Sequence, residues 1–233
     1  MFSYHPDIID RFPTIQAGVV HATGLINESS PDELANRYRA EQLSATRRLE
    51  ATPIAELGPI AAWRRVFSQF GVQPTRHRNA AESLLRRLSK HGDVPTINTL
   101  VDIGNLVSIR YAMPVAVLDV AGIDTTITVR QADGTESFTD LGSTEVTHPK
   151  HGEVIFVDRA GVVCARRWCW RQSANSATSG STTEALIVIE GHHDTARTDI
   201  DSAIDDVRGL LASHLSQARL TTHRLSAGSP GIG

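Results

Sequence analysis

The feature that most constrains the fold is a change of pattern near Pro114. Before it, apolar residues recur at helical spacing over residues 79–91 and 96–110, and after it come short runs rich in β-branched and aromatic residues. A last apolar stripe at helical spacing covers residues 199–216. Helices first, strands second and one closing helix predict an α+β fold, in which helices cover a central, mostly antiparallel sheet, rather than alternating βαβ units.

Capping signals place the starts of three helices. Ser30, followed by proline and then Glu33, predicts a polar, exposed helix that begins there and runs to about Leu49. Asn79 followed by an acid three residues later predicts the start of the 79–91 helix, and a glycine at position 92 its end. Thr198 is expected to cap the closing helix.

Gly104 lies inside the predicted helix 96–110, where glycine has no propensity advantage. A glycine at such a position typically allows a neighbouring element to approach closely. We therefore expect this helix to be central in the fold.

The strand-like runs lie mainly between Val115 and Glu190, and we expect them to form the central sheet. Residues 14–25 also predict a strand, residues 172–183 a polar loop, and the apolar run 185–189 an inner strand. The Ser/Gly/Pro-rich end after Leu225 is expected to be frayed. We divide the chain into an N-terminal strand and helix docked on the main domain, the main domain, and a C-terminal tail, which cover residues 1–60, 60–218 and 219–233.

Composition excludes several classes of protein. The chain of 233 residues carries 23 Lys+Arg and 26 Asp+Glu, so no overall charge points to a polyanionic or polycationic partner. Two cysteines cannot form a disulfide framework, and no signal peptide or apolar stretch long enough to span a membrane is present. The sequence therefore predicts a soluble cytoplasmic protein.

Common catalytic signatures are absent: the phosphate-binding P-loop, the dinucleotide glycine fingerprint, His-Glu-x-x-His and Gly-x-Ser-x-Gly. Cys164 and Cys169 are five residues apart in a predicted strand, on opposite faces, which favours simple packing. His192, His193 and Asp194 are the one cluster of potential metal ligands, but adjacent histidines usually diverge, and a polar loop is favoured. We expect no metal and no cofactor.

Arginines are concentrated in two places. Of the 23 basic residues only Lys90 and Lys150 are lysines, and residues 63–92 are rich in arginine. The second place is the segment 166–171, Arg-Arg-Trp-Cys-Trp-Arg. On a strand, Arg166, Trp168 and Trp170 would share one face, where aromatic rings could stack bases and guanidinium groups could hold phosphates. The alternative is that both tryptophans are core residues and the arginines pair with acids such as Glu153 or Glu190.

The run from Val94 to Asp119 carries a set of positions that matches a known pattern: Ile97, Asn98, Val101, Asp102, Ile103, Asn105, Pro114 and Asp119. This set resembles the B3/B4 module of the bacterial phenylalanyl-tRNA synthetase β subunit. The similarity continues through residues 127–136 and 152–155 into 183–190. The earlier residues Trp63, Arg64, Phe67, Gly71, Pro74, Arg86 and Arg87 look like those of free-standing B3/4-domain proteins. The resemblance covers roughly residues 60–215 and implies a single B3/B4-like domain.

In the synthetase this module hydrolyses tyrosine wrongly attached to phenylalanine tRNA. The resemblance therefore implies an editing-like deacylase that acts in trans on the aminoacylated 3′ end of a tRNA, because an aminoacyl ester is already activated and needs chiefly an oriented water. The implied catalytic residues are Glu190, Thr183 and Asn105. The implied substrate and RNA contacts are Arg86, Arg87, Arg166, Arg167 and Trp168.

Two departures from the synthetase pattern favour another possibility. A histidine of that pattern falls at Ala116, and its turn of small residues is replaced by the segment 166–171. The alternative function is a B3/4 module without catalysis that binds tRNA, a protein or an amino-acid-like ligand.

The site and the RNA-binding face can both be placed. The functional cleft should lie between the sheet and the helix 96–110, where five side chains should converge: Asn105, Arg166, Trp168, Thr183 and Glu190. The arginines of residues 63–92, together with those of 166–171, should form one positive face, because a protein with a net charge of −3 must otherwise repel RNA. The alternative is a purely structural role, in which these arginines pair with the acidic segment 183–206.

Overall fold

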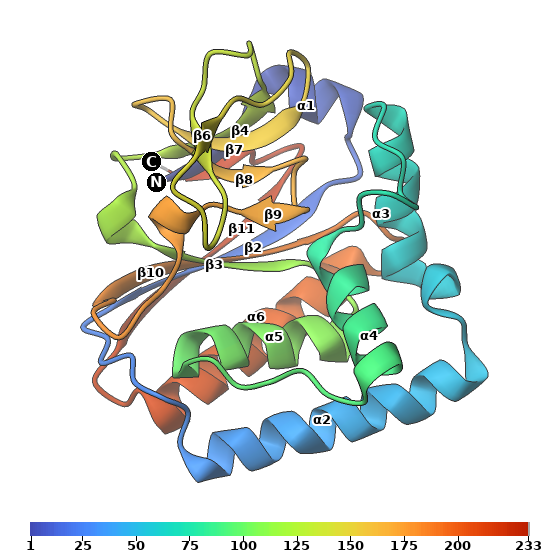
Figure 1. The fold of residues 1–233 in the computed structure, drawn as a ribbon, viewed down its shortest axis with the longest axis vertical. Helices are drawn as coiled ribbons and strands as arrows, with labels where there is room; N and C mark the ends of the chain where they lie inside the picture. Colours follow the sequence, from blue (N-terminus) through green and yellow to red (C-terminus); the bar gives the residue numbers. More distant parts are fainter. Residues whose placement is uncertain (233) are drawn as a thin grey trace.

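The computed structural model describes residues 1–232, which form two main sheets and a layer of helices (Figure 1). The helices are α1 (Pro6–Arg11), α2 (Asp32–Ala51), α3 (Gly58–Gln69), α4 (Ala80–His91), α5 (Thr99–Tyr111) and α6 (Ala196–His214). The strands are β1 (Phe2–Tyr4), β2 (Gln16–Thr23), β3 (Val115–Asp119), β4 (Ile127–Gln131), β5 (Phe138–Thr139), β6 (Val146–Thr147), β7 (Val154–Asp158), β8 (Val163–Arg166), β9 (Arg171–Gln172), β10 (Glu184–Gly191), β11 (Arg219–Ser226) and β12 (Gly231–Ile232). The predicted α+β class is confirmed.

Four antiparallel strands form the sheet that the helices cover, in the order β11-β2-β10-β3. Strand β10 is buried on both faces. Its side chains alternate, so that Ile187 and Ile189 pack with the helices while Leu186 and Val188 pack against the second sheet. This strand therefore needs a layer on each side.

The second sheet has the order β12-β1-β4-β7-β8-β9. Strand β1 runs parallel to β4, whereas the other pairings in this sheet are antiparallel. The prediction that the strands between Val115 and Glu190 form one central sheet is therefore wrong. They divide between the two main sheets and a separate two-stranded sheet of β5 and β6. Strand β10 is apolar on both faces and takes β2, from near the start of the chain, as its second neighbour.

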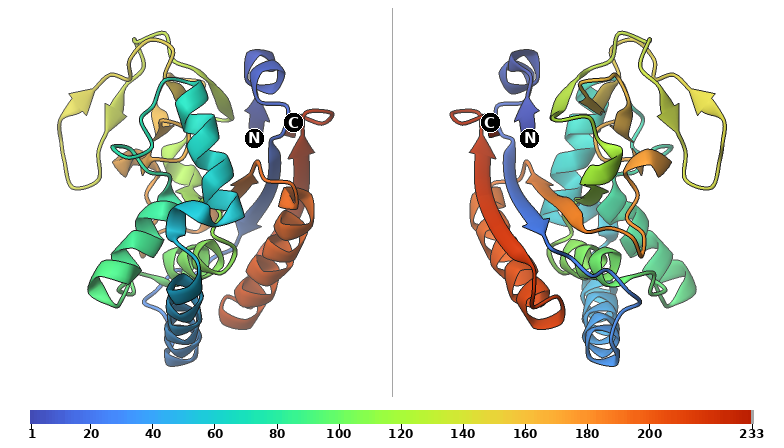
Figure 2. Two further views of the ribbon diagram at one scale, coloured as in Figure 1. Left: turned by 90° about the vertical axis from the view of Figure 1, so that its right-hand side faces the viewer. Right: turned by 90° about the vertical axis from the view of Figure 1, so that its left-hand side faces the viewer.

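Helices α5 and α6 lie on the outer face of the four-stranded sheet, and α2 packs against α5 (Figure 1). Figure 2 shows α6 running alongside β2 and β11. A Cβ atom at Gly104 would lie 2.6 Å from Cγ2 of Val117, so only glycine fits at this contact of α5 with β3. The close approach predicted for Gly104 is confirmed.

Helix starts depend on distant partners as well as on local sequence. The side chain of Asn79 accepts a hydrogen bond from the Glu82 amide, and Gly92 ends α4 in the left-handed conformation, as predicted. Ser30 does not cap α2, because its hydroxyl donates instead to Asp102 of α5. Helix α6 begins before Thr198, at Ala196.

The end of the chain is also paired. Residues 219–226, which the sequence assigns to a tail, form β11 alongside β2. Residues 231–232 form β12 and pair with Phe2 and Ser3 of β1, so the expectation of a frayed end is wrong for these residues. The division of the chain near residues 60 and 218 stays a prediction.

The two edges of the four-stranded sheet differ. At β3, the side-chain amide of Gln172 donates to the Val117 carbonyl over 2.8 Å, and Leu118 forms a bridge with Ala177. The outer edge of β11 has no strand beside it within residues 1–232 and carries exposed Arg219 and Arg224. None of the helices described is long and apolar enough to cross a membrane.

Candidate functional site

Glu190 is a buried carboxylate between the two sheets. It lies near the end of β10 on the face that packs against the second sheet, and only 3% of its surface is exposed. The Tyr4 hydroxyl donates to its Oε1 over 2.6 Å, and the Trp168 indole donates to the same oxygen over 2.8 Å. Burial raises the pKa of Glu190 to about 7, although both hydrogen bonds favour the charged form. The carboxyl group can therefore take up or release a proton near neutral pH.

Trp168 reaches Glu190 because the chain turns sharply after β8. The strand ends at Arg166, and Arg167 and Trp168 have φ values of 44° and 63°, a region that side-chain-bearing residues rarely occupy. The Trp168 amide donates to the Val154 carbonyl over 2.6 Å, which holds the turn. The prediction that residues 166–171 alternate along one strand is therefore wrong, because the strand ends at Arg166.

The interpretation of Trp168 as a core residue is supported. Its side chain is fully buried and contacts the rings of Phe12 and Trp63 edge to face. Arg166 forms two hydrogen bonds to Glu153, at 2.9 and 3.0 Å, as the alternative interpretation of this segment expects. Trp170 is partly exposed, and the guanidinium groups of Arg167 and Arg171 lie 4.3 and 4.8 Å from the centre of its ring.

A small cavity of about 60 Å³ lies beside Glu190. It has room for roughly two water molecules. Its walls bring together Glu190, Ala116 and the turn that carries Trp168, so both departures from the synthetase pattern meet at the same cavity as the carboxylate. The full lining is Ala80, Pro114, Val115, Ala116, Phe156, Ala165, Trp168, Cys169, Trp170, Arg171, Gln172 and Glu190. This "Glu190 cavity" can hold a water molecule against a carboxyl group that titrates near pH 7.

Asn105 and Thr183 do not join this cavity. Asn105 is on α5, on the other side of the four-stranded sheet, where it neighbours Tyr38. Thr183 is exposed before the start of β10, seven residues and therefore roughly 23 Å from Glu190 along an extended chain. The cleft predicted between the sheet and the helix 96–110 is wrong, because apolar side chains of α5 fill that space.

The arginines of residues 63–92 are partly used inside the fold. Arg64, Arg78 and Arg86 surround the buried carboxylate of Glu82 at 2.8, 3.8 and 2.9 Å. Arg87 is exposed. The predicted ion pairs with residues 183–206 are wrong for these three arginines, since they pair with an acid of their own segment.

The adjacent histidines diverge, as expected. Nδ1 of His192 lies 3.0 Å from the Thr14 hydroxyl, whereas Nε2 of His193 lies 2.8 Å from Asp199. Burial lowers the pKa of His192 to about 3, so this ring is neutral at physiological pH. Across residues 1–232 no three Cys, His, Asp or Glu side chains lie close enough to hold a metal ion.

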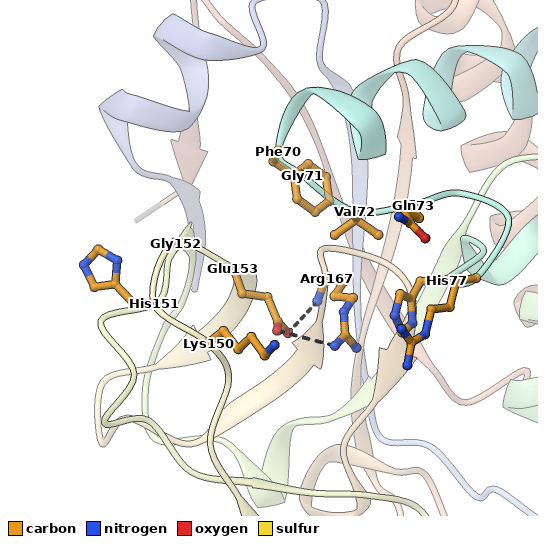
Figure 3. A pocket seen from close by; sticks show the side chains of 11 residues that line it. Phe70, Gly71, Val72, Gln73, His77, Lys150, His151, Gly152, Glu153 and Arg167 are labelled. Carbon is orange, nitrogen blue, oxygen red and sulfur yellow. Dashed lines mark hydrogen bonds and ion pairs between the residues drawn. The ribbon is translucent and has the colours of Figure 1, made fainter.

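A second and larger pocket, of about 360 Å³, lies on the other side of the same turn (Figure 3). Its lining is Phe70, Gly71, Val72, Gln73, Arg76, His77, Lys150, His151, Gly152, Glu153 and Arg167, and we call it the basic pocket. The sequence predicted one positive face for the arginines of residues 63–92 and of 166–171, and Arg76 and Arg167 of these two segments line this pocket together. The contribution of Lys150 was missed, because 74 residues separate it from Arg76 in the chain and only its basic character could have drawn attention to it.

Comparisons with known proteins identify part of the chain. The family described as "B3/4 domain" matches residues 62–206, a span that runs from α3 into α6 and includes the Glu190 cavity. Among curated proteins, none matches this chain.

Among solved structures, the chain is similar to the crystal structure of an N-terminal fragment of the phenylalanyl-tRNA synthetase β-subunit from Pyrococcus horikoshii. The two are 13% identical with a TM-score of 0.47. The similarity covers 94% of this chain and 50% of the other, so this chain spans about half the length of that fragment.

Proposed function

Since the chain belongs to the B3/4 domain family, we propose that it is a free-standing deacylase that hydrolyses a mischarged aminoacyl-tRNA in trans. The observation that carries the proposal is the position of Glu190, held by Tyr4 and Trp168 at the wall of a water-sized cavity. The sequence resemblance to an editing module supplies the substrate class.

In the proposed mechanism Glu190 acts as a general base. Its two hydrogen bonds go to Oε1, so Oε2 is the atom that would take a proton from a water molecule in the cavity. The oxygen of that water attacks the ester carbonyl, the bond from the carbonyl carbon to the ribose oxygen breaks, and the proton passes to the leaving oxygen. A base with a pKa near the working pH is the most effective, because it is both deprotonated and able to accept a proton.

The surface residues have different parts in this proposal. Arg166 is committed to Glu153 and positions the turn that carries Trp168. Arg87, which is exposed on α4, and Arg167 are the cations available to the phosphates of a tRNA. Arg86 pairs with Glu82 and is expected to contribute less to RNA binding.

The second candidate is a B3/4 module that binds its ligand without hydrolysing it. The observation that favours it is the wall of the Glu190 cavity. Ala116 offers no polar side chain there, and beside Trp168 only about 60 Å³ is left. A cavity of this size accepts a water molecule or a small polar group but not a large side chain.

A deacylation screen over a panel of mischarged tRNAs tests the proposal. The wild-type protein should hydrolyse at least one member, and Glu190→Gln, which keeps the shape of the side chain, should lower that rate by about 10²- to 10⁴-fold. Glu184→Gln is the matched control, because Glu184 lies at the far end of β10 and pairs with His21. Hydrolysis of no tRNA by the wild type, or equal rates for both variants, would contradict the proposal.

A further inference from the structure

The basic pocket holds more positive than negative charge. Arg76, Lys150 and Arg167 line it, and Glu153 is the one acidic residue in its lining. Figure 3 shows Arg167 between Glu153 on one side and His77 on the other, with Lys150 on the Glu153 side. These residues come from three separate segments that only the fold brings together, the loop after α3, the loop before β7 and the turn after β8.

Glu153 does not neutralise these cations, because it is already paired. Arg166, which is not part of the lining, takes both carboxylate oxygens of Glu153, while Nη2 of Arg167 lies 3.9 Å away. Arg76 and Lys150 form no ion pair with any acid in the part of the chain that the structure describes. Within residues 1–232, two of the three cations of the pocket therefore have no counter-ion, and Arg167 shares Glu153 with Arg166.

The conformation of Arg167 is unfavourable for folding. Its guanidinium group stacks 4.3 Å from the centre of the Trp170 ring, and its backbone has the unfavourable φ of 44°. Its Nη1 is buried and has no hydrogen-bond partner among residues 1–232. Strained backbone and an unpaired buried donor are unfavourable for folding, and they are typical of positions arranged for a ligand.

His77 adds a second unpaired donor or acceptor at the same place. Its Nδ1 is also buried without a partner within residues 1–232, and its ring contacts the edge of Trp170 at 4.8 Å. Burial, with the nearby charges of Arg167 and Arg76, lowers the pKa of His77. These effects favour the neutral form of the ring.

We propose that the basic pocket binds a phosphate group, with Arg76, Lys150 and Arg167 as its cationic ligands and His77 as a further hydrogen-bonding group. The planar fork of arginine suits phosphate oxygens, and a phosphate monoester with a charge near −2 balances three cations better than a single carboxylate does. The pocket, of about 360 Å³, has room for more than a phosphate group, so it can accept a phosphate carried by a larger molecule, a free nucleotide or the end of an RNA. This inference does not depend on hydrolysis at Glu190.

Calorimetric titrations at constant ionic strength, with adenosine 5′-monophosphate and with uncharged tRNA in separate arms, test this proposal. Arg167→Gln and Arg76→Gln should each weaken binding about tenfold, since each removes a charge-assisted hydrogen bond. Arg76 is exposed, so its variant is expected to fold even if the Arg167 variant does not. Arg65→Gln is the matched control, because Arg65 is exposed on α3 but does not line the pocket.

The two arms separate the sources of the phosphate. Binding of the nucleotide that depends on Arg76 and Arg167 identifies a free nucleotide, and binding of tRNA alone with the same dependence identifies an RNA phosphate. The proposal is overturned if neither ligand binds the wild type, or if the Arg65 variant loses as much affinity as the other two. Hydrolysis is measured separately, in the deacylation screen. A wild type that hydrolyses a mischarged tRNA there, but whose binding here does not depend on Arg76 or Arg167, would overturn this proposal and not the proposed deacylase.

Discussion

The Glu190 cavity and the basic pocket lie on either side of one turn, yet they have opposite chemistry. The cavity is small, lies between two sheets and surrounds one carboxylate whose hydrogen bonds come from uncharged groups. The pocket is about six times larger, at 360 against 60 Å³, and is lined by three cations and one acid, Glu153, which is already bonded to Arg166. Trp168 lines the cavity, and the adjacent residue Arg167 lines the pocket. The comparison shows two different requirements. A site for proton transfer needs weakly polar surroundings for its titrating group, whereas a site for an anion needs cations that the protein's own acids do not neutralise.

The largest expected effect is on stability and concerns the cavity side of the turn. Trp168→Ala removes a fully buried ring and a hydrogen bond to Glu190, so we expect a loss of about 3–5 kcal/mol in the free energy of unfolding. Trp170→Ala, on the same turn but partly exposed, should cost about 1 kcal/mol. Urea denaturation of both variants measures the difference, and equal losses would show that the two sides of the turn are not distinct.

The second effect concerns the pH dependence of stability. The pKa of Glu190 is raised from 4.5 to about 7 in the folded protein, so folding favours the protonated carboxyl. The stability that this group contributes is complete below pH 4.5 and is lost as the pH rises through 7. Relative to the wild type, Glu190→Gln should therefore gain about 3 kcal/mol between pH 5 and pH 8.

Urea denaturation at these two pH values measures that gain. His192, whose pKa is lowered to about 3, changes stability in the opposite direction, and it is present in both proteins, so its effect cancels in the difference. A gain that is the same at both pH values would mean that Glu190 does not titrate in this range.

A smaller effect is expected on the proton affinity of Glu190. Tyr4→Phe removes one of its two hydrogen bonds and should raise its pKa by about one unit, because that bond favours the charged form. Carboxyl carbon NMR during a pH titration measures the shift. Tyr111→Phe is the control, since Tyr111 donates to Asp206, far from the cavity. An unchanged pKa in the Tyr4 variant would contradict the proposed arrangement.

The smallest effect concerns the pocket side. The chain has only two lysines, both exposed, and only Lys150 lines the basic pocket. Lys150→Gln should weaken binding of adenosine 5′-monophosphate about two- to fivefold, as expected for a solvated charge, with no change in stability beyond about 0.5 kcal/mol. Lys90→Gln on α4 should change neither. Equal losses of affinity would indicate attraction by overall charge rather than by the pocket.

The sequence predicted what depends on neighbouring residues. Asn79 and Gly92 bound α4 as expected, since a cap and a left-handed glycine act within one turn. Ser30 failed as a cap because it met Asp102, 72 residues away in the chain, which no local pattern shows. Local propensity therefore predicted the fold class and most of the elements. It did not predict distant hydrogen-bond partners, such as Asp102, that decide whether a side chain caps a helix.

The candidate site was predicted only in part, for a similar reason. Glu190 and Trp168 lie at one cavity, but an extended strand separates Thr183 from Glu190, and a sheet separates Asn105 from it. The turn at Arg167 could not be predicted, because its positive φ values occur without glycine and are held by the Val154 carbonyl. The basic pocket was missed because it forms only when distant segments meet.

The unequal edges of the four-stranded sheet bear on how this protein avoids aggregation. A free strand edge can pair with a second copy of the chain and extend the sheet from molecule to molecule. The β3 edge is blocked by the Gln172 side chain and the bridge at Ala177. The β11 edge instead displays exposed Arg219, and Arg224, which pairs with Asp201 of α6. A second strand placed against this edge would strip water from these charged side chains.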